Sequence, residues 1–283
     1  MKIKWQENTE KNMQIRTKNE VTYLGYPKLE KTDGIIHGFS TRLGGVSEGV
    51  LGSMNLSFTR GDDPERVQEN YRRIADAIGF SVKDIVTSDQ THTTNVRVVT
   101  QEDRGKGITK PRDYTDVDGM ITNVPGLVLA TFYADCVPLY FVDPVQHAIG
   151  LSHSGWRGTV GKIGEVTVEK MREVYGTKPE DVIAAIGPSI CQECYEVSED
   201  VIEKFKEAFD RIYWEKLFYK KENGKYQLNL WQANYDILKE TGIREENILM
   251  PGICTCCNPH FLFSHRASHG KRGNLAAFLG LRK

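Results

Sequence analysis

The sequence predicts an α+β fold in which mixed β-sheets are flanked by helices. Helical and strand-like patterns alternate irregularly along the 283 residues, which disfavours a doubly wound parallel sheet. Two near-continuous apolar runs, Leu127–Tyr133 and Leu139–Val142, are typical of strands buried on both faces. A third segment, beginning at Pro64, has the spacing of an amphipathic helix. These observations together favour layers of sheet covered by helices.

The elements can be predicted in order along the chain. Residues 1–34 are polar and weakly patterned, and we expect an edge strand or a loose arm there. Ile35–Ser40 predicts a strand that runs into a glycine-rich loop. The first long helix should begin near Pro64, because Asp62 or Asp63 can cap it and proline suits the first turn. Its apolar face is formed by Val67, Tyr71, Ile74 and Ile78.

Further helices are predicted at Gly161–Tyr175, after Ser198, and at Trp231–Glu240, where Gly242 should end the last of them. The remaining short apolar segments predict strands at Ile85–Thr87, Val96–Thr100, Gly119–Thr122, Ala148–Ser152, Val182–Ile186, Tyr226–Leu230, Ile248–Met250 and Phe261–Phe263. The sequence shows no repeat, low-complexity tract or linker. We therefore expect residues 35–283 to form a single domain.

The composition disfavours several classes of protein. Lys+Arg 37 against Asp+Glu 38 leaves a net charge of -1, without the basic excess that nucleic-acid binding favours. The first ten residues have no apolar run that could serve as a signal sequence, and no stretch resembles a transmembrane helix. We expect a soluble cytoplasmic protein whose cysteines are thiols or metal ligands. The composition does not distinguish a monomer from a homodimer.

Three short segments each present a candidate metal ligand: His92, Cys136 and His153. Two imidazoles and one thiolate make a three-ligand zinc set, and catalytic zinc sites use three protein ligands and leave the fourth position to water. The three residues are far apart in the sequence, so only a folded domain could bring them together. Cys136 and His153 also follow predicted strands, where loops expose side chains on a rigid frame. The sequence therefore predicts a catalytic zinc site.

Two cysteine pairs form a rival metal site. Cys191-Gln-Glu-Cys194 and Cys254-Thr-Cys-Cys257 have the C-x-x-C spacing of a closed four-cysteine zinc site. Their separation far exceeds the usual ribbon spacing of about 15–20 residues. Whether the pairs meet, and whether they bind a second metal ion, is left open by the sequence.

Arg157 is a candidate anion ligand. It lies in Gly155-Trp-Arg-Gly158, directly after His153 and just before the helix predicted from Gly161. A helix start offers free backbone N–H groups, and a guanidinium can grip phosphate through two parallel hydrogen bonds. The alternative is an ordinary strand-to-helix turn that needs glycine for its backbone geometry.

Several short motifs follow one another in a fixed order along the chain: Ser40-Thr-Arg-Leu-Gly-Gly-Val-Ser47, Asn55-Leu56, Gln90-x-His92, Ala134-Asp-Cys-Val-Pro138, His153-Ser-Gly-Trp-Arg-Gly158, Ile186-Gly-Pro-Ser-Ile190, Cys194-Tyr-Glu-Val197 and Phe263-Ser-His-Arg266. Together these motifs resemble the YfiH/YlmD family, whose members are described as multicopper polyphenol oxidases (laccase-domain proteins) and as purine nucleoside phosphorylases. The resemblance runs from about residue 35 to the C-terminus.

The resemblance implies a four-layer α/β/β/α-like fold and a zinc site at His92, Cys136 and His153. It also implies phosphorolysis of adenosine, inosine and methylthioadenosine, with an adenosine deaminase activity. Within the matched motifs, Arg42, Gln90 and Arg266 are candidate substrate contacts beside Arg157. Asp135 is a candidate acid–base residue, or one that orients the Cys136 loop.

The sequence departs from the family pattern at two places. The family usually has Gln-Val-His-Gly, whereas two threonines, Thr91 and Thr93, flank His92 here. The family's arginine- and glycine-rich C-terminal run appears as Arg266-Ala-Ser-His-Gly-Lys-Arg-Gly273. His269, Lys271 and Arg272 are therefore expected to change the rim of the substrate site.

Three other functions remain open. Cys136 could be the nucleophile of a cysteine hydrolase or amidase, with His153 as its base. The three ligands could also hold zinc in a non-catalytic binding protein. A copper-dependent polyphenol oxidase is disfavoured, because the chain has His 7 and no His-x-His pair to supply paired copper ligands. Zinc is the expected cofactor, and copper could occupy the same ligands in vitro.

Overall fold

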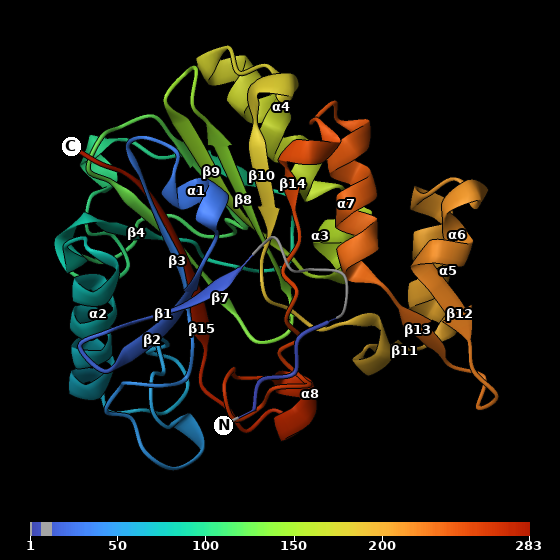
Figure 1. Ribbon diagram of the computed structural model, residues 1–283, viewed down its shortest axis with the longest axis horizontal. Coiled ribbons are helices and arrows are strands. Elements are labelled where there is room, and N and C mark those ends of the chain that lie inside the picture. Colours follow the sequence, from blue (N-terminus) through green and yellow to red (C-terminus); the bar gives the residue numbers. More distant parts are fainter. Residues whose placement is uncertain (1, 7–12) are drawn as a thin grey trace.

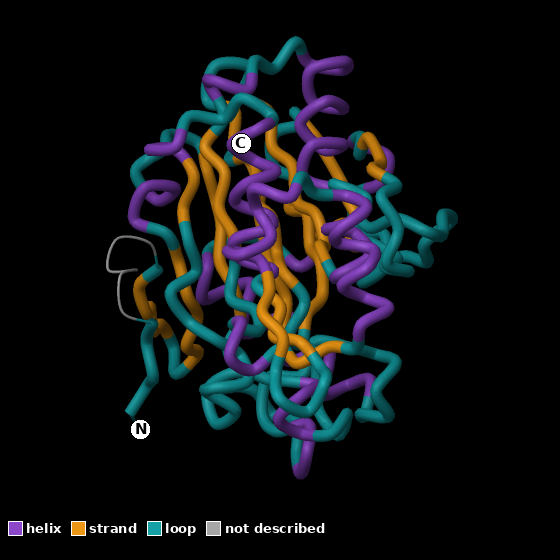
Figure 2. Tube along the Cα trace, turned by 90° about the vertical axis from the view of Figure 1, so that its right-hand side faces the viewer, coloured by secondary structure: helices purple, strands orange, loops and turns teal. Residues whose placement is uncertain are grey.

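The computed structural model describes residues 2–6 and 13–283. Within these residues the strands form two six-stranded sheets and one three-stranded sheet. Helices cover the outer face of each large sheet, with α2 (Pro64–Ile78) on one side of the molecule and α4 (Ile163–Tyr175) and α7 (Leu230–Glu240) on the other (Figure 1). In Figure 2, turned by 90° from Figure 1, the strands run side by side and helices overlap them in the view.

The first sheet is mixed, since only its β4–β7 pair is parallel. In spatial order its strands are β1 (Gln14–Lys18), β2 (Val21–Gly25), β3 (Ile35–Ser40), β15 (Leu275–Leu281), β7 (Val128–Tyr133) and β4 (Ile85–Thr87).

The second sheet is mixed as well, with parallel pairs at both of its edges. In spatial order its strands are β14 (Ile248–Leu249), β10 (Ile183–Ile186), β8 (Val137–Asp143), β9 (Ala148–Ser154), β6 (Gly119–Thr122) and β5 (Val96–Val98). The small antiparallel sheet consists of β11 (Glu196–Val197), β13 (Tyr226–Leu228) and β12 (Phe218–Lys220).

Successive side chains on the central strands point to opposite faces of the sheet, and the two faces pack into different hydrophobic cores. On β7, Val128 and Ala130 pack with the apolar face of α2, whereas Leu129 belongs to the core between the two large sheets. On β8, Tyr140 lies in that central core, whereas Phe141 packs with the core beneath α4 and α7. Both strands are buried on both faces, which is why their sequences are near-continuous apolar runs. The layers are therefore α/β/β/α, and the predicted α+β fold is confirmed.

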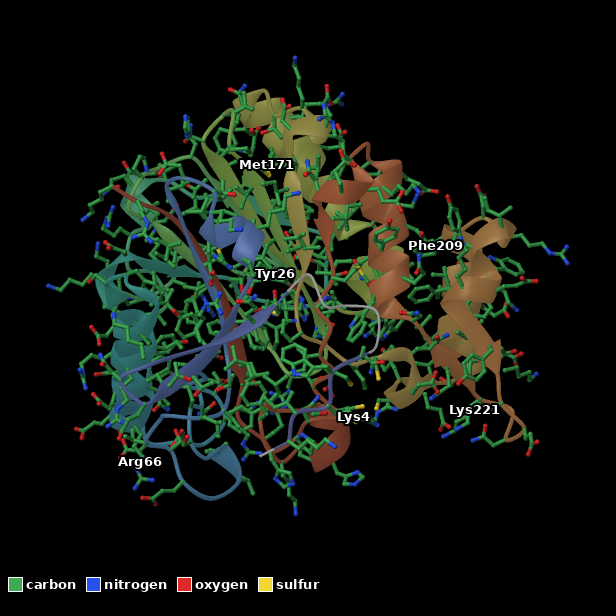
Figure 3. The ribbon with its side chains drawn as sticks, viewed as in Figure 1. Lys4, Tyr26, Arg66, Met171, Phe209 and Lys221 are labelled. Atoms are coloured by element: carbon green, nitrogen blue, oxygen red, sulfur yellow. The ribbon has the colours of Figure 1, made fainter. Side chains whose placement is uncertain are left out.

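Two labelled side chains in Figure 3 mark these cores. Tyr26, which follows β2 of the first sheet, donates its hydroxyl to the Ile186 carbonyl of β10 in the second sheet at 2.5 Å, so it joins the two sheets. Met171 on α4 is fully buried against the outer face of the second sheet.

The first long helix forms as predicted. Its N-cap is Asp63, whose carboxylate accepts a hydrogen bond from the Glu65 N–H, and Pro64 occupies the first position. It ends at Gly79, which has a φ of 101° that favours glycine. The remaining α-helices are α1 (Pro27–Glu30), α3 (Trp156–Val160), α5 (Glu199–Ala208), α6 (Trp214–Leu217) and α8 (His265–Ser268). No helix in residues 2–6 and 13–283 is long and apolar enough to cross a membrane.

Three sequence expectations need correction. Phe261–Phe263 is not a strand: the N–H groups of Phe261 and Leu262 both bond to the Asn258 carbonyl, so this apolar segment is a buried turn. The helix predicted at Gly161–Tyr175 is present as α4 (Ile163–Tyr175), but a separate short helix, α3 (Trp156–Val160), precedes it and was not predicted; Lys162, whose φ is 53°, divides the two. The C-terminal strand β15 was not predicted at all, although it lies at the centre of the first sheet.

The N-terminal segment 1–34 includes residue 1 and residues 7–12, which lie outside the described part of the chain. From residue 14 onward it forms β1 and β2, and β1 is the edge strand of the first sheet. The division into an N-terminal arm and a single domain over 35–283 stays a prediction.

Candidate metal centre

The three predicted ligands come together where the chain crosses from one large sheet to the other. Cys136 lies in the link between β7 of the first sheet and β8 of the second, and His92 lies in the link between β4 and β5. His153 sits on β9 opposite Pro138 of β8. The Cys136 sulfur and one ring nitrogen of each histidine lie within 4.8 Å of one another. The two imidazole rings are nearly perpendicular, with their centroids 4.8 Å apart.

Asp118 orients both histidines, and sequence reasoning missed it. Its Oδ1 lies 2.7 Å from Nδ1 of His153, so a protonated Nδ1 would leave Nε2 of that ring free to bind a metal ion. Its Oδ2 accepts hydrogen bonds from the backbone N–H groups of Thr91 at 2.9 Å and Thr93 at 3.0 Å, the two residues that flank His92. One buried carboxylate therefore fixes one ligand directly and the loop of another.

The charged groups at the site shift the pKa values of Cys136 and His153 in opposite directions. Burial alone would raise the pKa of the Cys136 thiol, but the neighbouring His153 and His92 lower it to about 6. Burial alone would lower the pKa of His153, but Cys136 and Asp118 raise it to about 9. The thiolate is the form of cysteine that binds metal, and this environment favours it at neutral pH.

The backbone at the site is constrained. His92 and Asp135 have φ values of 67° and 89°, in a region that non-glycine residues rarely adopt. Gly155 packs so closely that a Cβ there would lie 2.9 Å from Cδ2 of His92 and 3.3 Å from Sγ of Cys136. A side chain at residue 155 would therefore disturb two ligands at once, and this is the physical need for glycine in the His153-Ser-Gly-Trp-Arg-Gly158 motif.

A cavity of about 600 Å³ opens onto all three ligands. Its volume lies within the range of small-molecule sites. It combines aromatic rings with cationic groups, and its lining includes Phe58, Tyr71, Phe132 and Tyr133 together with Arg60, Lys110, Arg112 and Arg272. Because His92 is exposed, the ligand set is accessible from this cavity.

Arg272, which the sequence analysis placed at the rim of the substrate site, lines the large cavity. Burial and the nearby positive charge of Arg60 lower the pKa of its guanidinium to about 10. Its Nε is buried without a hydrogen-bond partner, and no carboxylate in the described residues forms an ion pair with it. A bound anion would satisfy this group and offset the repulsion from Arg60. The sequence signal was the altered C-terminal run that contains it.

Arg157 lies on the other side of the ligands. It lines a smaller cavity of about 100 Å³ together with His92, Asp135, Cys136 and Tyr195, and its guanidinium stacks on Trp156 at 4.3 Å. No carboxylate of the described residues forms an ion pair with it, so its donors are available to a ligand. It belongs to the five-residue helix α3, and not to the approach to a long helix as the sequence suggested.

Asp135 holds the Cys136 loop. Its Oδ1 accepts from the Thr255 hydroxyl at 2.6 Å, and its Oδ2 accepts from the Arg266 backbone N–H at 2.7 Å. Its carbonyl accepts from the Ile190 N–H at 2.9 Å. Both carboxylate oxygens are thus engaged with protein groups.

The side chains of Gln90 and Arg266, two of the predicted substrate contacts, form hydrogen bonds with backbone groups. The Gln90 amide pairs with Phe132 in both directions, at 2.8 Å to its carbonyl and 2.6 Å from its N–H, although Gln90 also lines the large cavity. Arg266 donates to the carbonyls of Cys194 and Glu196 at 3.1 and 2.9 Å.

Arg42 is not brought to the metal ligands. Its guanidinium donates to the carbonyls of Gly52 and Pro259 and lies 4.7 Å from the centre of the Phe263 ring. It lines a separate cavity of about 220 Å³. Its role as a substrate contact stays a prediction.

Comparisons with known proteins agree with this geometry. The chain is 37% identical over 253 residues to "Purine nucleoside phosphorylase YlmD" of Bacillus subtilis (strain 168), and this match covers 88% of the chain and 89% of the relative. It is 34% identical to "Adenosine deaminase RL5" of an unknown prokaryotic organism, over 84% of this chain and 93% of that one. The crystal structure of the Bacillus licheniformis hypothetical protein YfiH superposes with a TM-score of 0.86 at 33% identity, covering 95% of this chain and 99% of that one.

The family model described as multi-copper polyphenol oxidoreductase laccase matches residues 36–282, which is nearly the whole chain. With the likeness to YlmD and YfiH, this match shows that the chain belongs to that laccase-domain family.

Proposed function

We propose that the protein is a zinc-dependent purine nucleoside phosphorylase that acts on adenosine, inosine and methylthioadenosine, with adenosine deamination as a side activity. The observation that carries the proposal is the three-ligand set of His92, Cys136 and His153 opening onto a cavity of about 600 Å³. The names of the relatives, purine nucleoside phosphorylase and adenosine deaminase, support the same substrate class.

The donor set fits zinc. Three ligand atoms converge, His153 is held by a carboxylate through its other ring nitrogen, and Gly155 leaves room beside the sulfur. A bound zinc ion supplies a Lewis acid and lowers the pKa of a coordinated water, which is the chemistry that deamination needs. A multicopper centre fits less well, because the other ligand group in the described residues consists of four cysteines and no histidine.

The large cavity suits a nucleoside. Its aromatic side chains, with Phe58 and Tyr71 stacked at 5.8 Å, offer apolar surface for a purine base. In phosphorolysis, a phosphate oxygen replaces the base at the sugar, and the products are the free base and a ribose phosphate. The protein's contribution to such a step is largely positioning and charge.

Two arginines are candidates for holding phosphate. Arg157 adjoins the ligands from the small cavity, and Arg272 shares the large cavity with all three ligands. Both guanidiniums lack a carboxylate partner among the described residues. We assign phosphate to Arg157 and treat Arg272 as its competitor, which the variants in the Discussion separate.

Asp135 is assigned a positioning role. Its carboxylate accepts from Thr255 and from the Arg266 N–H, so an acid–base role would require those hydrogen bonds to break. Holding the Cys136 loop needs no such change.

A cysteine hydrolase is the second candidate function. Cys136, His153 and Asp118 form a chain of thiol, imidazole and carboxylate that resembles an activated nucleophile. Such an enzyme would keep its activity after chelation and lose it on alkylation of Cys136.

The deciding experiment measures zinc content together with product formation. Purified protein is incubated with adenosine, with and without phosphate, and adenine and inosine are quantified before and after chelation. We expect phosphate-dependent adenine release that stops when zinc is removed and returns when zinc is restored. Turnover that survives complete metal removal would overturn the proposal in favour of the cysteine hydrolase.

A further inference from the structure

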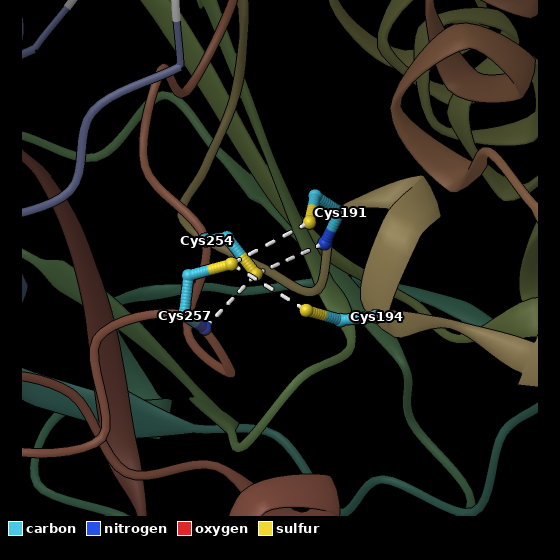
Figure 4. A group of neighbouring side chains, drawn as sticks. All are labelled: Cys191, Cys194, Cys254 and Cys257. Carbon is cyan, nitrogen blue, oxygen red and sulfur yellow. Dashed lines mark hydrogen bonds between the residues drawn. The ribbon is translucent and has the colours of Figure 1, made fainter.

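A second group of sulfur atoms lies apart from the large cavity. Cys191, Cys194, Cys254 and Cys257 place their Sγ atoms within 4.8 Å of one another, although Cys191 and Cys254 are 63 residues apart. Figure 4 shows the four sulfurs converging from two separate turns of the chain. None of the four is among the residues that line the large cavity.

The spacing of the sulfurs fits a single tetrahedral ion. A Zn–S bond of about 2.3 Å corresponds to sulfurs about 3.8 Å apart at the corners of a tetrahedron. The sulfurs of Cys191 and Cys257 are 3.9 Å apart, and those of Cys194 and Cys257 are 3.4 Å apart. Only small side-chain adjustments would be needed to surround one ion.

The backbone is arranged as it would be around thiolates. Each pair lies on a tight turn, the first in the 3₁₀ helix Gln192–Cys194 and the second in the turn after Cys254. The N–H groups of Cys191 and Cys257 point at the Cys254 sulfur, at 3.2 and 3.4 Å. Such hydrogen bonds orient sulfur ligands and stabilise their negative charge.

The two turns are held together independently of any ion. Ser189 and Cys254 form a parallel β-bridge, and the Thr255 N–H donates to the Ser189 carbonyl at 3.1 Å. The site is therefore pre-arranged by the fold. All six cysteines of the chain, every one within the described residues, are free thiols.

We propose that Cys191, Cys194, Cys254 and Cys257 bind a second zinc ion, in a closed four-thiolate site with a structural role. Four protein ligands leave no open position for a substrate, which distinguishes this group from the three-ligand set. Cys256 lies on the same turn but outside the group.

The site would brace the loop that presents Cys136. Both turns contact Asp135, the neighbour of Cys136: Ile190, which precedes the first pair, donates to its carbonyl, and Thr255, inside the second pair, donates to its carboxylate. Arg266 completes the link, since its backbone N–H binds the Asp135 carboxylate and its guanidinium binds the Cys194 carbonyl. The second ion is thus a positioning element for the first site.

The test uses the full chain with Cys136→Ala, which removes the first site. After expression with added zinc and extensive dialysis, this variant should retain about one zinc per chain. Adding Cys194→Ser or Cys257→Ser should abolish that zinc, whereas Cys256→Ser in the same background is the matched control and should leave it unchanged. Cys136→Ala protein without zinc, or zinc that persists in both double variants, would overturn the proposal.

A second measurement does not depend on the folding of the variants at Cys194 and Cys257. The Cys136→Ala protein, freed of zinc and loaded with Co²⁺ alone, should show the absorption bands of a tetrahedral four-thiolate complex. An octahedral cobalt spectrum, an iron–sulfur chromophore in the isolated protein, or a metal-free Cys194–Cys257 disulfide found by mass spectrometry would each contradict the proposal. Because all these readouts are free of nucleoside turnover, they stand or fall separately from the proposed activity.

Discussion

The two sulfur-containing groups differ in how the chain builds them and in what they face. The three-ligand group is assembled from two links between the large sheets and a central strand, with His92 exposed toward a cavity of about 600 Å³. The four-cysteine group is built from two tight turns that face each other, and its members are buried or half-buried. The first arrangement leaves space beside the ligands, whereas the second encloses its own centre.

The two groups therefore depend on different amounts of the surrounding fold. The four-cysteine group needs only two turns in contact, and its geometry follows from C-x-x-C spacing. The three-ligand group needs both sheets in register and a carboxylate, Asp118, that fixes His153 and the His92 loop together. Damage to the fold should therefore affect the three-ligand group first.

Removing a ligand of the open group should have the largest effect on activity. We expect Cys136→Ala to lose the zinc of that group and to lower kcat/KM by about 1,000-fold or more, corresponding to about 4 kcal/mol of transition-state stabilisation. Zinc content and adenine release check this, with Cys256→Ser as the control that should keep both. A Cys136→Ala enzyme with normal turnover would remove the three-ligand group from the mechanism.

The next largest effect should come from Arg157, the proposed phosphate ligand. Arg157→Ala should lower phosphorolysis by roughly 30- to 1,000-fold, since a lost charge-assisted contact costs roughly 2–4 kcal/mol, while zinc stays bound. Deamination uses water and should fall much less. Arg157→Lys should recover only part of the loss, because an ammonium keeps the charge without the planar fork.

The same assay on Arg272→Gln identifies which arginine holds phosphate. If the phosphate-specific loss appears there and not in Arg157→Ala, the assignment moves to the large cavity. Arg172→Ala, on the exposed face of α4, is the control for a general loss of positive charge. Equal loss of both activities in Arg157→Ala would mean that this residue orients the site as a whole.

A smaller effect is expected from the carboxylate that holds the two histidines. Asp118→Asn keeps the size of the side chain but removes its charge, and it should weaken zinc binding in the open group by about 10- to 100-fold. Competition with a chelator measures this, and Cys194→Ser provides a background in which only the open group is observed. Asp113→Asn, which alters a solvent-exposed ion pair with Lys106, should leave zinc affinity unchanged.

The sequence predicted the three candidate ligands better than the residue that supports them. His92, Cys136 and His153 each stand in a motif beside a strand, so residue type and position were both informative. Asp118 gave no such signal, because an aspartate before a strand is common and its two partners are distant in sequence. The placement of the strand predicted at Gly119–Thr122 next to β9 could have suggested it only with the sheet order known.

Elements of the fold could be predicted where their own apolar pattern in the sequence reflects how they are buried. The helix at Pro64–Ile78 was found from one apolar face, and the two buried central strands from continuous apolar runs. Strand β15 lacks an alternating pattern because both of its faces are buried, and its glycine and alanines weaken the apolar signal. Phe261–Phe263 was wrongly predicted as a strand, because its apolar side chains are buried by tertiary contacts although its backbone forms a turn.

The smallest effect concerns the link between the two groups. Thr255→Val keeps the shape of the side chain but leaves Oδ1 of the buried Asp135 without its donor, which should cost about 1–3 kcal/mol of unfolding free energy. Because Asp135 adjoins Cys136, we also expect a several-fold loss of kcat, with zinc still bound at both groups. Thr177→Val is the matched control: its hydroxyl is buried without a partner, so the same substitution should be neutral or stabilising there. Denaturant unfolding and steady-state kinetics on both variants measure the two effects. If Thr255→Val lowers stability but leaves kcat unchanged, the four-cysteine turns support the fold without positioning Cys136, and the two groups are independent.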